Sequence, residues 1–224
     1  RQELFVVGLP AGGGGVAASL RALYSEPIVA RDETGNEIGT FGAHDLELGL
    51  AYGWRHRDGL RFGAGAQVVR ERIEQSAATT FAFSLGGAWD PAALPAWRLA
   101  LALQNAGPGG AFTIENGEKG QAVPLPLAVQ TGVRWAGSVG GTWERRIALE
   151  TRLTSGRPAI VMLGAELAQA SGAAVRLGWR VNDDATDFTL GAGWTAGGLA
   201  LDYAYVPARL DLGDTHRVSF TTRL

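Results

Sequence analysis

The sequence contains no cysteine, a single lysine and only three histidines. The absence of cysteine excludes disulfide bonds and every metal site built on thiolates. Because the lone lysine is Lys119, the other basic residues are all arginines, and these are spread along a chain of net charge −2. A chain without a basic stripe has no surface that would neutralise a phosphate backbone, so nucleic acid is not expected as a partner.

Long apolar runs are also missing. The longest, residues 159–165, is far shorter than the ~18–20 residues that a membrane-spanning helix needs. No helical pattern of about 10–15 residues with capping residues occurs, which argues against parallel βαβ folds. The chain opens on Arg1 without an initiator Met, a basic segment or an apolar leader. We therefore expect that a signal peptide has been removed or that the sequence is a fragment.

Few residues have the spacing typical of a catalytic or metal-binding site. His44, His56 and His216 form no His-x-x-x-His or Glu-x-x-His pair, so we expect no catalytic residue, no metal and no cofactor. The segment 182–187 holds three aspartates that could together ligate Ca²⁺. Its Asn-Asp-Asp start is also ordinary hairpin chemistry, and we favour the turn.

What the sequence does contain is alternation with a period of two, which is typical of β-strands. In residues 127–135, for example, Leu, Val, Thr, Val and Trp alternate with Ala, Gln, Gly and Arg. Short Gly/Asn/Asp/Ser clusters separate such segments, as in a meander of hairpins. The pattern predicts about thirteen strands, whereas residues 12–15 and 31–40 read as loops. The predicted strands begin near Gln2, Val16, Asp45, Leu60, Thr79, Trp97, Leu125, Arg145, Ala159, Ala173, Asp187, Leu199 and Thr215.

The two faces of these strands favour a transmembrane barrel over a soluble sandwich. A sandwich would carry Lys, Thr, Glu and Ser outside, but the less apolar face here is mostly Gly and Ala with scattered Arg and Glu. Such residues suit a confined lumen. The 33 glycines, about twice the usual share of ~7 %, fit this interpretation. The aromatic residues near strand ends indicate interfacial girdles, although they could instead form the core of a soluble β domain; they are Trp54, Trp89, Trp97, Trp135, Trp179, Trp194, Tyr203 and Tyr205.

Charged residues in the inward phase are the candidate functional residues. They could line a polar path through the lumen, or they could pair with one another and brace the barrel, because uncompensated charges in a confined space are costly. We favour bracing. The set is Glu47, Arg61, Arg134, Glu150, Arg152, Arg176, Arg180 and Asp202.

Three sequence motifs resemble the PorV/PorQ-like outer-membrane proteins. The most specific is the C-terminal stretch 201–219, LDYAYVP followed by LGDTHRVS, whose turn residues are Asp211, Gly213, Asp214 and His216. The Asn-x-Gly-Pro turn at 105–108 and the Leu-Pro-Leu strand start at 125–127 also match. The resemblance covers roughly residues 40–224, but the Gly/Ala-rich start of that family is absent.

The resemblance implies an all-β, antiparallel, up-and-down transmembrane β-barrel of the FadL-like type with about 12–14 strands. Residues 1–224 would form one outer-membrane domain whose N-terminal part is missing. The implied role is non-enzymatic docking or shuttling in type IX secretion, with membrane lipid and exported proteins or secretion components as partners. The alternative is a FadL-like passive channel for hydrophobic or small solutes, and an enzyme acting on lipid or peptide is a remote third.

Overall fold

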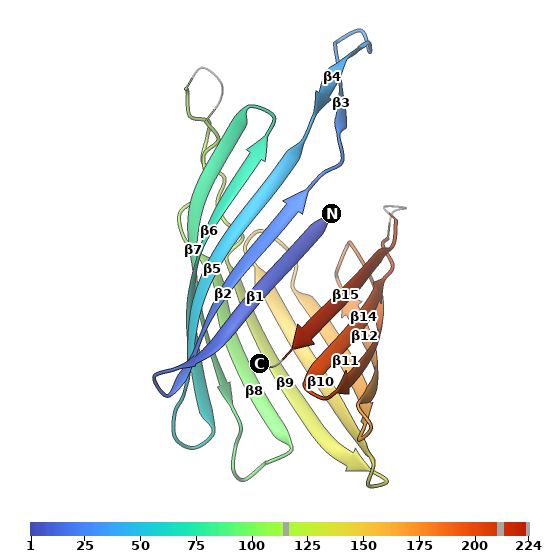
Figure 1. Ribbon diagram of the computed structural model, residues 1–224. Coiled ribbons are helices and arrows are strands. Elements are labelled where there is room, and N and C mark those ends of the chain that lie inside the picture. The colour runs from blue at the N-terminus through green and yellow to red at the C-terminus, as the bar shows by residue number, and fades with distance from the viewer. Residues whose placement is uncertain (114–116, 210–212, 223–224) are drawn as a thin grey trace. The chain divides into compact units, whose positions relative to one another are not determined.

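The computed structural model describes residues 1–113, 117–209 and 213–222, and within them the chain is all β (Figure 1). Thirteen strands form one sheet in the order β1-β2-β5-β6-β7-β8-β9-β10-β11-β12-β13-β14-β15, and β3 and β4 form a separate pair. The strands are β1 (Gln2–Ala11), β2 (Gly14–Tyr24), β3 (Ile28–Arg31), β4 (Glu37–Phe41), β5 (Ala43–Arg55), β6 (Leu60–Ile73), β7 (Ser76–Trp89), β8 (Trp97–Ala106), β9 (Ala128–Val139), β10 (Trp143–Thr154), β11 (Ile160–Gln169), β12 (Ala173–Val181), β13 (Phe188–Ala196), β14 (Leu199–Val206) and β15 (Thr215–Thr222).

The large sheet confirms the all-β, antiparallel prediction. Each of its thirteen strands begins within three residues of a start expected from the alternation. Neighbours in the sheet follow one another along the chain apart from the inserted β3–β4 pair, as in a meander. No helix among the described residues is long and apolar enough to cross a membrane.

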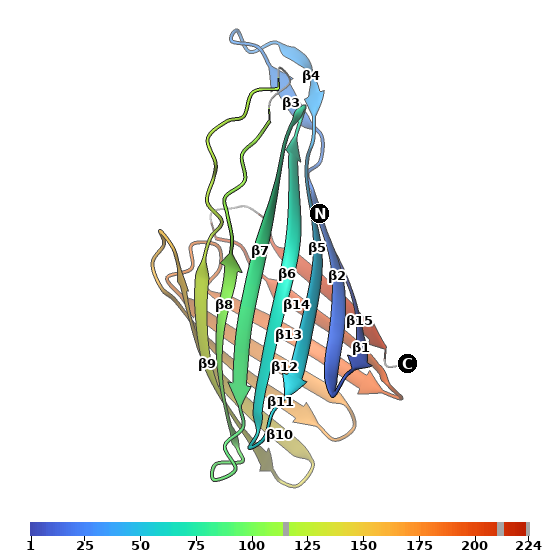
Figure 2. The same ribbon diagram turned by 90° about the vertical axis from the view of Figure 1, so that its left-hand side faces the viewer.

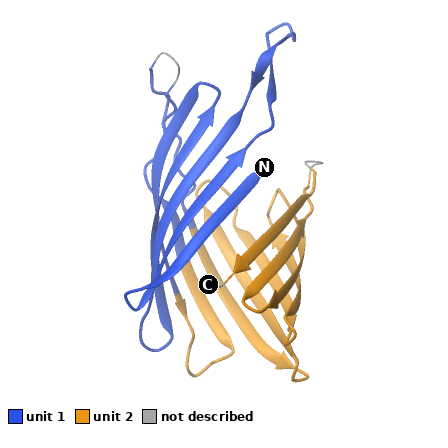
Figure 3. Cartoon of the chain, viewed as in Figure 1, with its two compact units in different colours: residues 1–87, 102–128 blue, residues 88–101, 129–224 orange. Residues whose placement is uncertain are grey.

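The chain divides into two compact units, shown in Figure 3. Unit 1 comprises residues 1–87 and 102–128, and its strands β2, β5 and β6 pair over long, unbroken registers (Figure 2). Unit 2 comprises residues 88–101 and 129–224, where β10 to β15 pair in sequence. The expectation of a single domain stays a prediction.

One face of the sheet is apolar and exposed. Leu50 is 65 % exposed, Trp194 58 % and Val218 71 %. Within the described ranges, the buried hydrophobic residues are all small: Ala78, Ala82 and Ala128. This is the reverse of a water-soluble domain, where large apolar side chains are buried in a core. A sandwich would need a second large sheet to cover this face, whereas the described residues form one large sheet and the short β3–β4 pair, which argues against that alternative.

We call the face with the large exposed apolar side chains the outer face and the opposite one the inner face. Register places residues of one face directly opposite each other on neighbouring strands. Leu177 and Leu190, for instance, are opposed on the outer face, and Gly178 and Thr189 on the inner face. The inner face therefore carries the glycines, small residues and most charges, as the alternation predicts.

The prediction that residues 31–40 form only a loop is wrong. They contain most of the β3–β4 hairpin, which extends beyond β2 and β5 (Figure 1). The Asp32 carboxylate closes its turn by accepting hydrogen bonds from the backbone N–H groups of Thr34 and Asn36, at 2.9 and 2.8 Å. Arg31 then pairs across the hairpin with Glu37 at 2.6 Å. These local contacts close the turn and align the strand-forming residues on its two sides, such as Ile28 and Phe41.

The segment after β8 folds against the inner face of β7. Asn105 leaves the strand with a positive φ of 60°, and Pro108 then accepts a 2.7 Å hydrogen bond from the Thr80 hydroxyl. This segment covers Ala78 and Thr80, which are only 5 % and 6 % exposed. The Asn-x-Gly-Pro motif therefore turns the chain onto the inner face of unit 1.

Glycine is required at the third position of that motif. A Cβ on Gly107 would lie 2.1 Å from the backbone oxygen of Phe81, so Gly107→Ala forces the two backbones apart. We expect a loss of about 1–3 kcal/mol in unfolding free energy, the usual cost of overpacking, measured by denaturant titration. Gly164→Ala is the matched control, because nothing lies within 4 Å of its Cβ position. Equal stability of the two variants would contradict this account of the turn.

Candidate functional site

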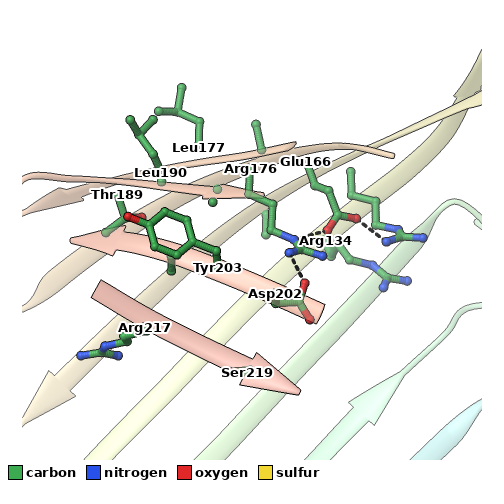
Figure 4. Close-up of a pocket in the computed structure, with 17 residues that line it drawn as sticks. Arg134, Glu166, Arg176, Leu177, Thr189, Leu190, Asp202, Tyr203, Arg217 and Ser219 are labelled. Atoms are coloured by element: carbon green, nitrogen blue, oxygen red, sulfur yellow. Dashed lines mark hydrogen bonds and ion pairs between the residues drawn. The ribbon is translucent and has the colours of Figure 1, made fainter. Parts of the chain in front are cut away.

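The inner face of unit 2 carries a hollow of about 490 Å³, shown in Figure 4. We call it the charged hollow. Its charged lining residues are Arg134, Arg146, Glu166, Arg176, Asp202 and Arg217, which come from β9, β10, β11, β12, β14 and β15. Alternation brings them to one face, and the sheet order brings their strands side by side. Three of the predicted lumen residues, Arg134, Arg176 and Asp202, thus line one site.

Four of these side chains, together with Glu144, form a ladder of alternating charge. Arg176 donates to Glu166 and, at 2.6 Å, to Asp202. Arg146 donates to the other Glu166 oxygen and, at 2.8 Å, to Glu144. Each arginine thus bridges two carboxylates, a geometry that suits the planar, multi-donor guanidinium and not the ammonium of lysine. The near-absence of lysine from the sequence agrees with this requirement.

Two glycines make room for Arg176. A Cβ on Gly193 would lie 2.5 Å from the Asp202 carboxylate and 2.8 Å from Nη1 of Arg176. A Cβ on Gly191 would lie 3.3 Å from the Arg176 Cβ. The alternation of Gly with large outer residues in β13 therefore leaves the volume that the ladder occupies.

Glu144, Arg146 and Glu166 were not among the predicted lumen residues. Their signal was available in the register: Arg146 lies opposite Glu166, and Glu166 lies opposite Arg176. Opposite charges in directly opposed positions stabilise a sheet. Counting residues back from the predicted hairpin turns would have aligned them, because the side-chain period is two.

The other predicted lumen charges lie outside this ladder. Glu47 pairs with Arg21 in unit 1, and Glu150 accepts a 2.6 Å hydrogen bond from Gln130 in unit 2. Arg61 lies opposite Arg55 in the register, and Arg152 lies opposite Ile160. Arg180 pairs with the turn that follows its own strand. The predicted set thus divides into several separate local groups.

The turn after β12 is closed by Asp183, which is 8 % exposed. One carboxylate oxygen accepts a 2.6 Å hydrogen bond from Arg180 and the other a 2.9 Å hydrogen bond from the Ala185 N–H. Partial burial would raise the pKa of Asp183, but the Ala185 and Arg180 bonds outweigh it and hold the pKa below its ordinary value. Asp187 pairs separately with Arg209 at 3.1 Å. These contacts agree with a turn. Among the described residues, no cluster of three or more His, Asp or Glu side chains is arranged to hold a metal ion.

The C-terminal motif turn is held by tyrosines of β14. Tyr205 donates to the Asp214 carboxylate, which also accepts a 3.3 Å bond from the Ala208 N–H. Gly213 has a φ of +78°, a conformation that favours glycine. His216 shares a 2.7 Å hydrogen bond with the Tyr203 hydroxyl, so it contacts the outer aromatic face. Asp211 lies outside the described residues.

Unit 1 has a second hollow on its inner face, of about 350 Å³, which we call the small-residue hollow. Its centre is formed by Ala17, Ala51 and Gly65, which are aligned across β2, β5 and β6. No Arg, Lys, Asp or Glu is among its described lining residues. The small-residue hollow and the charged hollow therefore differ in character, one having an uncharged lining and the other a charged one.

The fold belongs to the class of FadL-like β-barrels. The chain is similar to the crystal structure of the Ralstonia pickettii toluene transporter TbuX, with a TM-score of 0.62 and 12 % sequence identity, covering 98 % of this chain and 80 % of that one. At this identity the likeness shows a shared fold. No protein-family model and no curated protein matches the chain, so the PorV/PorQ resemblance stays a prediction.

Removing Arg176 tests whether the ladder braces the sheet. Arg176→Gln should lower the free energy of unfolding by about 1–2 kcal/mol, between the values for exposed and buried pairs, because Asp202 loses its arginine and Glu166 loses one of two. Arg217→Gln is the control, since Arg217 makes no ion pair within the described ranges. Unchanged thermal stability of Arg176→Gln with altered conductance would instead favour a polar path.

The pH dependence of stability tests Asp183. Because its pKa is lowered in the folded state, its contribution is present above the unfolded pKa of about 3.9 and is lost as the pH falls through the folded value. Asp183→Asn should therefore melt at a lower temperature than the wild type at pH 7, and the difference should shrink below about pH 4. A constant difference in melting temperature across this pH range would show that the charge is not responsible.

Proposed function

We propose that the protein is a non-enzymatic outer-membrane barrel that admits small hydrophobic solutes passively. The observation that carries the proposal is the uncharged small-residue hollow on the inner face of a sheet whose outer face is apolar. The docking role in protein export is the second candidate.

The outer face supports placement in a lipid bilayer. Side chains such as Leu50, Leu177 and Trp194 are more than 45 % exposed and have no protein partner that would remove them from water. Burying them in hydrocarbon is favourable at ~25 cal/mol per Å². Strands of 13 and 14 residues, β5 and β6, exceed the 9–11 or so needed to span a bilayer. The strands from β2 to β14 in the sheet order have a neighbour on both sides, which satisfies their peptide groups within the protein as lipid requires, whereas β1 and β15 each pair with one neighbour.

The small-residue hollow supports movement of an apolar solute. Alanine and glycine at its centre leave space where larger side chains would fill the inside of the sheet. A solute there meets few polar groups, so it need not strip hydrogen-bonding partners from the wall. Its volume is at the lower end of the ~300–1,000 Å³ typical of small-molecule sites. Weak contacts of this kind favour passage over retention.

The fold comparison adds to this reasoning. TbuX is described as a toluene transporter, and we carry over only the expectation that a barrel of the same fold can admit a small apolar molecule. The charged ladder does not contradict this, because none of its residues lines the small-residue hollow.

Docking or shuttling of exported proteins rests on the C-terminal motif. The motif residues that carry the resemblance to PorV/PorQ proteins bond to one another through Tyr205 and Asp214, which supports a defined surface at this turn. Co-purification of exported proteins or secretion components with a tagged chain would favour this role over passive transport.

A bulky side chain in the small-residue hollow should slow solute entry. We expect Ala51→Trp to reduce the uptake of toluene by liposomes containing the folded protein several-fold, because Ala51 lies between Ala17 and Gly65 on the inner face. Leu50→Trp is the matched control: it introduces the same side chain one residue away, on the outer face, where Leu50 is 65 % exposed.

Folding of both variants is checked by the heat-dependent gel shift of detergent-extracted protein, boiled against unboiled. Uptake equal to that of empty liposomes for the wild type would contradict passive transport. Equal uptake by the two folded variants would show that the solute does not pass this hollow.

A further inference from the structure

The charged hollow of unit 2 has an excess of positive lining charge. Its described lining includes four arginines but only two carboxylates, Glu166 and Asp202. Figure 4 shows Glu166 and Asp202 each bonded to an arginine side chain. The hollow therefore presents more hydrogen-bond donors than acceptors to anything that enters it.

Most acceptors of the surrounding ladder are already occupied. The two Glu166 oxygens are bonded to Arg146 and Arg176 respectively. The two Glu144 oxygens are both bonded to Arg146. Asp90, on the same unit, gives both oxygens to Arg98. Asp202 gives one oxygen to Arg176, and Asp90 and Glu144 act on Arg134 electrostatically without bonding to it.

Arg134 and Arg217 are the remaining cations of the lining. Neither guanidinium group makes a hydrogen bond or ion pair with any residue in the part of the chain that the structure describes. The Nε atom of Arg134 is enclosed and without a hydrogen-bond partner, whereas its terminal nitrogens are not enclosed. A desolvated guanidinium with donors free on one side is a site for an incoming acceptor.

The floor beside these cations is small and uncharged. Ala148, Gly164, Gly178, Gly191 and Ala204 lie on neighbouring strands of the lining and leave the volume of about 490 Å³ open. This volume suits one small molecule, not a long chain. The site thus combines a cation at one side with a surface for an apolar body.

We propose that the charged hollow binds a small organic anion, with its carboxylate or equivalent group on the terminal nitrogens of Arg134 and its apolar body on the glycine and alanine floor. This names a second, anionic class of solute, and its physiological meaning rests on the proposed transport function. Arg134 is the residue that determines selectivity for charge. Arg146 and Arg176 hold their positions through the carboxylates that they bridge.

Benzoate and benzyl alcohol are suitable probes, because they share an aromatic body and differ in charge. The full chain, folded in detergent micelles, is titrated with each by calorimetry. Benzoate should bind roughly tenfold more tightly, and Arg134→Gln should remove that preference, the effect of losing a charge-assisted hydrogen bond. Arg145→Gln is the matched control, because Arg145 stacks on Trp135 and does not line the hollow. Its benzoate affinity should be unchanged.

Equal affinity of the wild type for the two probes would overturn the proposal, as would an unchanged benzoate preference in folded Arg134→Gln. Should that variant fail to fold, Arg134→Lys, which keeps the charge but not the bidentate geometry, must bind benzoate more weakly than the wild type does. Toluene uptake by liposomes made with the same purified protein distinguishes the two proposals. Uptake without benzoate preference contradicts the anion site alone, and benzoate preference without uptake contradicts passive transport alone.

Discussion

Cross-strand pairing of the backbone is the constraint on which the rest of the structure depends. The large apolar side chains lie on the exposed face, so they contribute no buried core, and the hydrophobic residues buried in the described ranges are alanines. The strands are held together by continuous registers such as that between β5 and β6. The side chains then have to satisfy two surroundings, an apolar one outside and a confined one inside.

The confined inner face accounts for the unusual composition. Glycine and alanine leave room, and a charge that enters this space needs a partner at close range. Arg176 illustrates both requirements, since it bridges Glu166 and Asp202 and occupies volume that Gly191 and Gly193 leave free. Arg134 has room on the inner face, but its guanidinium has no hydrogen-bonded partner among the described residues. This is why we propose Arg134 as the residue that binds an anion.

Much of the fold could be predicted from the sequence, because successive side chains of a strand point to opposite faces and the residue types therefore alternate with a period of two. The thirteen strands and the inward phase of Arg134, Arg176 and Asp202 followed from it. The β3–β4 hairpin could not be predicted in this way, since its strands depend on the hydrogen bonds of Asp32 and on the pairing of Arg31 with Glu37. The ladder and the covering of β7 depend on register and on a loop path, neither of which alternation alone determines.

The ladder also has a consequence for how the sheet assembles. A slip of one residue between neighbouring strands moves every side chain to the wrong face, so the apolar pattern is sufficient to disfavour it. A slip of two residues returns every side chain to its own face, so the apolar pattern hardly distinguishes this arrangement from the native register. The direct opposition of Arg146 to Glu166, and of Glu166 to Arg176, is lost in that slipped arrangement. The opposed charges of β10, β11 and β12 therefore favour the native register over the other registers that the apolar pattern permits.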